Sequence, residues 1–156
     1  MKKVSYTLLF ILICFFVSPQ NKSHFFPKED LMSIGVYYYP EHWDKNDWER
    51  DIKNISEIGF EFIHFAEFAW ANMEPQEGVY NFKWLDEVIG LAEEYNLKVI
   101  LGTPTAIAPV WLGIKHPEIY AMGSNYLRAE HGTRAQQSLS NPIWRTYSQK
   151  MITKLG

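Results

Sequence analysis

The side chains best suited to bind a ligand in this sequence stand at the ends of two apolar stretches. Glu41 and His42 follow the first stretch, and His64, Glu67 and Trp70 end or follow the second. Carboxylate and imidazole groups form hydrogen bonds with hydroxyl groups, and an indole ring offers a flat apolar face. Residues just past the ends of parallel strands line the mouth of an α/β barrel, so we expect these side chains at such a mouth.

Predicted strands and helices alternate along the part of the chain that carries these side chains. Apolar runs predict strands at about 34–39, 60–65 and 98–101. Helical spacing and capping residues predict helices at about 45–58, 82–95 and 109–114 and from 142 onward, with loops at 72–81 and 116–141. This alternation predicts an α/β fold, a (β/α)8 TIM barrel of which only the first three to four βα units are present. A closed barrel needs roughly 250 residues, and because the chain has 156, we expect residues 24–156 to be a truncated N-terminal part of that domain.

Residues 1–23 have the pattern of a signal peptide. A basic start at Lys2 and Lys3 precedes an apolar run at 8–17 and then a polar segment with a proline. The run is shorter than the ~20 residues of a membrane span, so we expect cleavage, a secreted or periplasmic protein and no stable membrane insertion. An uncleaved N-terminal anchor is the alternative. Cys14 is the only cysteine, and its removal with the leader would leave no thiol for a disulfide, a metal or a nucleophile.

The amino-acid composition favours some classes of binding partner over others. The formal net charge is −3, and a chain without a basic face is a poor partner for nucleic acid. Six Trp and nine Tyr residues suit flat, hydroxylated, uncharged ligands, although most aromatic residues in any protein belong to the core. The chain has no glycine-rich phosphate loop or dinucleotide fingerprint, and its histidines lack metal-ligand spacing. We therefore predict no cofactor and no metal site.

Several motifs in register resemble the glycoside hydrolase family 42 β-galactosidases. They are Gly35-Val-Tyr-Tyr-Tyr-Pro-Glu-His-Trp43, Ala66-Glu-Phe-Ala-Trp70 and Leu101-Gly-Thr-Pro-Thr-Ala106, and the resemblance covers about 34–156. It implies a TIM-barrel retaining enzyme that acts on β-galactosides or related oligosaccharides and forms homo-oligomers at full length. Its two catalytic glutamates, an acid/base after strand four and a nucleophile after strand seven, lie beyond Gly156 in family order. No catalytic residue is therefore assigned here, and the fragment by itself is expected to be inactive.

The resemblance also bears on single residues. Arg134 matches a family arginine placed over the sugar site and is the strongest candidate for a ligand contact. His64 stands where family members carry an arginine that binds galactose, and histidine lacks the fixed charge and the five-donor fork of arginine. Ser138 stands near the position of a zinc-binding cysteine found in some members, and serine is not a structural zinc ligand.

Some assignments remain open at this level. Glu67 either orients Arg134 or a sugar hydroxyl, or accepts backbone N–H groups in a loop. Trp70 either stacks on a sugar or packs in the core, and for Trp111 core packing is favoured. Glu41 and His42 are expected to form turn hydrogen bonds more often than ligand contacts.

The predicted substrate-binding set is therefore Arg134, His64, Glu67 and Trp70. The first hypothesis is an exported β-galactosidase. The alternatives are a β-glycosidase of altered sugar specificity, suggested by His64, and a non-catalytic truncated gene remnant.

Overall fold

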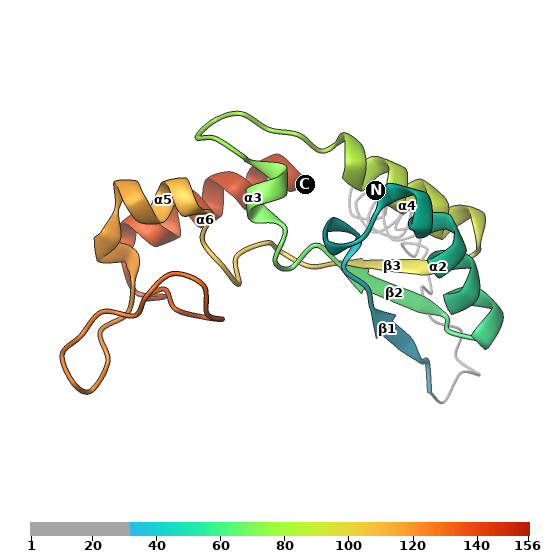
Figure 1. Ribbon diagram of the computed structural model, residues 1–156, viewed down its shortest axis with the longest axis horizontal. Coiled ribbons are helices and arrows are strands. Elements are labelled where there is room, and N and C mark those ends of the chain that lie inside the picture. Colours follow the sequence, from blue (N-terminus) through green and yellow to red (C-terminus); the bar gives the residue numbers. More distant parts are fainter. Residues whose placement is uncertain (1–31) are drawn as a thin grey trace, which may run out of the picture. The chain divides into compact units, whose positions relative to one another are not determined.

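The computed structural model describes residues 32–156, which contain a three-stranded parallel sheet (Figure 1). The strands β1 (Gly35–Tyr37), β2 (Phe62–Phe65) and β3 (Lys98–Leu101) lie in the order β1-β2-β3. The register places Tyr37 beside His64 and His64 beside Ile100. The three predicted strands and their parallel pairing are thus confirmed. β1 ends before Pro40, which has no N–H to donate to a neighbouring strand.

Two helices cover one face of this sheet (Figure 1). They are α2 (Lys45–Ile58) and α4 (Lys83–Glu94), and both lie where apolar residues at helical spacing predict them. The Asp44 carboxylate accepts a hydrogen bond from the backbone N–H of Asn46 at 2.9 Å and caps α2. Gly59 ends α2 with φ of 99°, a left-handed conformation that glycine adopts without a steric penalty.

One part of the core lies between the sheet and these helices, and the rest extends into α3, α5 and α6. Ile63 and Phe65 of β2 are fully buried, together with Ile52 of α2 and Val88 of α4. Successive side chains of a strand point to opposite faces. The other face is more open, since Tyr37 is 60% exposed and Ile100 is 38% exposed. Among the described residues, helices therefore close one face of the sheet.

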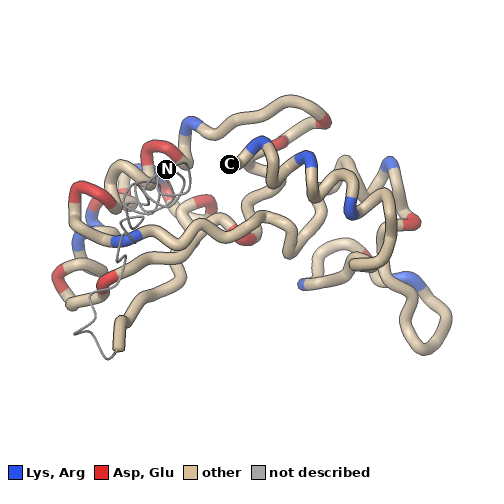
Figure 2. The backbone as a smooth tube through the Cα atoms, turned by 180° about the vertical axis from the view of Figure 1, so that it is seen from behind, with Lys and Arg blue, Asp and Glu red and all other residues tan. Residues whose placement is uncertain are grey.

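The helices α2 and α4 carry different distributions of charge. Figure 2 shows both signs along α2, whereas the later part of α4 is acidic. Within residues 32–156, no helix combines the length and apolar character needed to cross a membrane. The predicted signal peptide at 1–23 and its Cys14 lie outside the described residues.

The remaining helices are two short ones between the strands and three that follow β3 in sequence. They are η1 (Pro40–His42), α3 (Trp70–Met73), α5 (Val110–Lys115), η2 (Pro117–Ile119) and α6 (Pro142–Leu155). α6 begins as predicted, because the Asn141 side chain accepts hydrogen bonds from the N–H groups of Ile143 and Trp144 at 2.9 and 3.1 Å. α5 packs against α6 where the rings of Trp111 and Tyr147 meet with their centroids 5.8 Å apart.

Two loop predictions are wrong in part. α3 occupies the start of the predicted loop at 72–81, because burial of Trp70 and Met73 stabilises a single turn that shows no periodicity in the sequence. The connection at 116–141, predicted as a loop, is partly ordered. It contains η2 and isolated antiparallel bridges, including Tyr120 with Gln137. Such non-local pairing leaves no regular pattern in the sequence.

Candidate functional site

The candidate site lies at the carboxyl edge of the sheet. Tyr39 follows β1, His64 belongs to β2, Glu67 follows β2 and Gly102 follows β3. Because all three strands are parallel, their carboxyl ends meet at one edge, which is where α/β folds bind ligands. Arg134 reaches the same place from the long connection before α6.

Glu67 is the centre of this cluster. The Tyr39 hydroxyl donates a hydrogen bond to its Oε1 atom at 3.2 Å, and the Arg134 Nη2 atom lies 3.7 Å from the same oxygen. The His64 Nδ1 atom lies 4.0 Å from the other oxygen, Oε2. The structure thus brings together three of the four predicted site residues. Of the two alternatives for Glu67, its position beside Arg134 favours the orienting role.

The backbone around Glu67 is tightly constrained. Ala66, which precedes it, is fully buried and has φ of 81°, a region that non-glycine residues rarely occupy. A Cβ atom added to Gly102 would lie 2.9 Å from the Glu67 Cβ and 3.1 Å from its backbone. The Gly102 N–H donates to the Phe65 carbonyl at 2.9 Å and continues the sheet into the loop. Only glycine allows the end of β3 to approach Glu67 this closely.

Aromatic rings support the Arg134 side chain. Its guanidinium carbon lies 4.4 Å from the centroid of the Phe68 ring, a distance at which the ring face attracts a cation. The Tyr39 ring lies beside Phe68 and beside His42, with both pairs of centroids 5.7 Å apart. Sequence reasoning missed Tyr39 and Phe68 as site residues. Their place just past strand ends is the feature that could have revealed them.

The cluster also shifts proton affinities. Burial, and then the negative charge of Glu67, raise the pKa of Tyr39 above its ordinary value, so its hydroxyl remains a hydrogen-bond donor. Burial also raises the pKa of Glu41, and the nearby charge of Glu67 adds to this shift. Both carboxyl oxygens of Glu41 are buried without a hydrogen-bond partner within the described residues.

Trp70 is a core residue, so the interpretation that it stacks on a sugar is corrected. Its side chain is fully buried, and its indole N–H donates to the Glu74 carboxylate at 2.8 Å. Its ring centroid lies 5.3 Å from that of Trp144 in α6. Trp111, for which the sequence favoured the core, is partly buried and donates its indole N–H to the Glu74 carbonyl at 2.9 Å. The exposed face that stacking requires is absent at Trp70.

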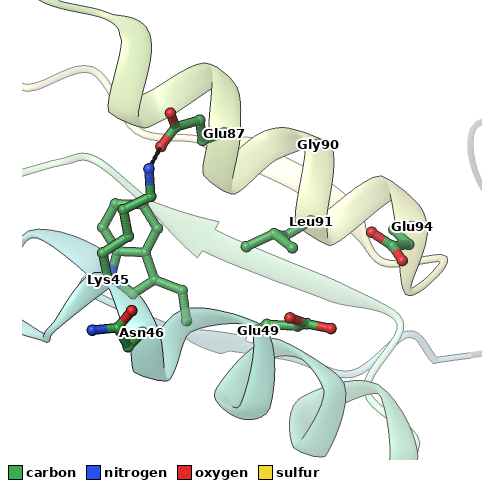
Figure 3. Close-up of a pocket in the computed structure, with 8 residues that line it drawn as sticks. Lys45, Asn46, Glu49, Glu87, Gly90, Leu91 and Glu94 are labelled. Carbon is green, nitrogen blue, oxygen red and sulfur yellow. Dashed lines mark ion pairs between the residues drawn. The ribbon is translucent and has the colours of Figure 1, made fainter.

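A separate groove lies between α2 and α4. Figure 3 shows the Lys45 ammonium pointing toward the Glu87 carboxylate, with which it forms an ion pair, while Glu49 and Glu94 lie further along the groove. None of the residues clustered around Glu67 lines this groove. It is therefore distinct from the candidate site.

The side chains at the carboxyl edge are suited to binding a ligand through hydrogen bonds. A guanidinium donates several hydrogen bonds, and a carboxylate accepts them, so Arg134 and Glu67 together match a hydroxyl-rich ligand. Within residues 32–156, no group of three or more His, Cys, Asp or Glu side chains is placed to hold a metal ion.

Comparisons with known proteins identify the family of the chain. A family model described as Beta-galactosidase, of glycoside hydrolase family 42, matches residues 37–156. The chain is 41% identical over 121 residues to Beta-galactosidase BgaA of Clostridium cellulovorans and 40% identical over 123 residues to a beta-galactosidase of Thermus thermophilus. These alignments cover 78% and 79% of this chain but only 18% and 19% of the relatives.

Solved structures give the same result. The beta-galactosidase of the Antarctic haloarchaeon Halorubrum lacusprofundi superposes with a TM-score of 0.76 at 35% identity, over 80% of this chain and 19% of that one. The beta-galactosidase of the psychrophilic Marinomonas ef1 also gives 0.76, at 36% identity and the same coverage. The chain thus spans about a fifth of the length of the proteins it matches. On the family match, the sequence identity and the shared fold, the chain belongs to glycoside hydrolase family 42.

Proposed function

We propose that the protein containing these residues is a retaining glycosidase that hydrolyses terminal β-D-galactosides. The observation that carries this proposal is the contact between Arg134 and Glu67 at the carboxyl edge of the sheet of a family 42 chain. In the proposed role, Arg134 donates hydrogen bonds to hydroxyl groups of the terminal sugar. Glu67 and Tyr39 hold the guanidinium side chain in place.

The reaction needs two carboxyl groups that residues 32–156 are not proposed to supply. A retaining glycosidase uses one carboxylic acid to protonate the leaving group and one carboxylate to attack the sugar, about 5–5.5 Å apart. We propose that both glutamates come from a part of the protein equivalent to the remaining four fifths of the relatives, with further strands that close the sheet into a TIM barrel. Residues 32–156 alone are then inactive.

Assays with a panel of nitrophenyl glycosides test this function. The protein containing these residues should have its highest kcat/KM for the β-galactoside, and NMR of the first product should show the β-anomer, as expected for retention. A preference for another sugar would reject the galactoside assignment, and an α-anomer would reject the retaining mechanism. Residues 32–156 expressed alone serve as the inactive comparison.

A second candidate is a β-glycosidase of altered sugar preference, and the position of His64 favours it. His64 lies in the central strand β2 at the site edge, and its ring centroid lies 4.4 Å from that of Tyr37. Its Nδ1 atom is buried and has no hydrogen-bond partner among residues 32–156. The His64→Arg variant tests this candidate. A shift of preference toward β-galactosides in the variant would support it, whereas a strong preference for β-galactosides in the unaltered protein would reject it.

Export and assembly are parts of the same proposal. The sequence pattern at 1–23 supports cleavage and release to a secreted or periplasmic location, and cell fractionation with N-terminal sequencing of the mature protein would test it. Family resemblance supports a homo-oligomer at full length, which light scattering would test. A folded product that binds galactose but turns over no glycoside would instead favour a non-catalytic remnant.

A further inference from the structure

We propose that Gln136 is the residue that positions Arg134 for ligand binding. This inference rests on the proposed function, in which Arg134 contacts the sugar. The side chain of Arg134 is 72% exposed, and a long, exposed side chain loses considerable rotamer freedom when it binds. Its backbone must therefore be held in place for the guanidinium to meet a ligand at a fixed position.

The hydrogen bonds of Gln136 close a tight turn around Arg134. Its side-chain carbonyl oxygen accepts from the backbone N–H of Thr133 at 2.8 Å and from the Thr133 hydroxyl at 3.3 Å. Arg134 and Ala135 lie between these two linked residues. Ala135 has φ of 50°, a left-handed conformation that is uncommon for alanine. The bonds from Gln136 therefore stabilise a turn that the local sequence does not favour.

Gln136 also joins this turn to the rest of the fold. The residue is only 3% exposed, and its backbone carbonyl accepts from the N–H of Ala121 at 2.8 Å. The next bond along the turn runs from the Ala135 N–H to the carbonyl of Ala106, at 3.2 Å, in the loop that follows β3. The turn that carries Arg134 is thus fixed both to its own connection and to the carboxyl edge of the sheet.

The neighbouring Gln137 provides a matched control. It is also buried, at 4% exposure, and its amide nitrogen, like that of Gln136, has no hydrogen-bond partner within the described residues. Among residues 32–156, no hydrogen bond joins its side chain to the turn. Its backbone forms a bridge with Tyr120. Methionine is close to glutamine in size and lacks the carbonyl acceptor. Gln136→Met and Gln137→Met therefore each remove one buried amide, but only Gln136→Met removes hydrogen bonds of the turn.

Kinetics of the protein containing these residues test the positioning role. Gln136→Met should lower kcat/KM for the β-galactoside about tenfold, mainly through KM, because it removes two hydrogen bonds that fix the turn. Gln136→Glu keeps an acceptor oxygen and should remain within about threefold of the parent. Gln137→Met should also remain within about threefold. Equal losses in the Gln136→Met and Gln137→Met variants would overturn the proposal.

A double-mutant cycle separates positioning from general stability. In an Arg134→Ala background, Gln136→Met should lower kcat/KM by less than about twofold further, because the side chain that it positions is gone. A full tenfold loss in that background would overturn the inference. Should Gln136→Met fail to fold, Thr133→Ala, which removes the hydroxyl donor alone, should still give a smaller increase in KM, and an unchanged KM would count against the proposal.

Amide hydrogen exchange gives a readout that does not depend on catalysis. Exchange in the segment 131–136 should become faster in Gln136→Met and stay unchanged in Gln137→Met. If the parent protein shows no galactosidase activity while this exchange pattern holds, the proposed function fails and the turn assignment stands. If activity is present and exchange is the same in both variants, the inference about Gln136 fails and the proposed function stands.

Discussion

The Arg134 Nη2 atom lies 3.7 Å from the Glu67 Oε1 atom, which links the long connection before α6 to the carboxyl end of β2. This contact joins a cation to a carboxylate that also accepts a hydrogen bond from Tyr39. Such shared contacts reduce the freedom of each partner, and they place donors and acceptors together where α/β folds bind their ligands.

Replacing Arg134 tests this placement directly. Arg134→Ala should lower kcat/KM for the β-galactoside by about ten- to a hundredfold, because hydrogen bonds from a charged group contribute about 1.5–3 kcal/mol. Steady-state kinetics provide the measurement. Arg145→Ala, at an exposed position of α6, is the matched control and should leave kcat/KM unchanged. Equal values for both variants would remove Arg134 from the site.

Glu41→Gln should make the stability of the protein less dependent on pH. Burial raises the pKa of Glu41 above 4.5, its ordinary value, so the folded chain holds this proton more tightly than the unfolded chain. The stabilisation from the bound proton is complete below the unfolded pKa and is lost as pH rises through the folded pKa. The variant should therefore have a higher Tm than the parent at pH 7. Below pH 4.5 the two proteins should have similar Tm values.

The control for that comparison is Glu93→Gln, at an exposed position of α4. Thermal unfolding of all three proteins across the pH range provides the measurement. Parallel pH profiles for the Glu41→Gln variant and the parent would show that Glu41 is not desolvated in the folded protein.

Gly102→Ala should destabilise the protein and disturb the site. The added methyl group would lie 2.9 Å from the Glu67 Cβ and 3.1 Å from its backbone, and overpacking of this kind costs about 1–3 kcal/mol. Because Glu67 must move, KM for the β-galactoside should also rise.

Gly90→Ala is the matched control, since a methyl group there meets open space in the middle of α4. It should stabilise the protein by about 0.5–1 kcal/mol. Denaturant unfolding that ranks the two variants in reverse would contradict this account.

Trp70→Phe should reduce stability without weakening substrate binding. The change removes the indole N–H that donates to the Glu74 carboxylate, and Glu74 is only 3% exposed. An unsatisfied buried acceptor costs about 1–3 kcal/mol. Trp43→Phe, where the side chain is 58% exposed, should change stability little. An increase in KM for the Trp70 variant without a loss of stability would restore Trp70 as a sugar contact.

Much of the fold could be predicted from local sequence patterns. Caps at Asp44, Gly59 and Asn141 fix helix ends through hydrogen bonds within a few residues, and the helix bounds predicted at 45–58 and from 142 onward are confirmed. The parallel strands follow from apolar runs separated by helical segments. The one-turn helix α3 was missed because long-range burial of Trp70 and Met73, and not local spacing, stabilises it.

Local patterns and motifs in the sequence were enough to assign the family, the order of strands and helices and the group of residues near strand ends. Tertiary structure decided how those residues are used, because burial and distance depend on segments far apart in the chain. It placed Trp70 in the core beside Trp144, added Tyr39 to the site, and brought Arg134 next to Glu67. Strand pairing places Tyr39 beside Glu67, and the long connection before α6 brings Arg134 to the same carboxylate, so neither contact depends on neighbouring residues alone.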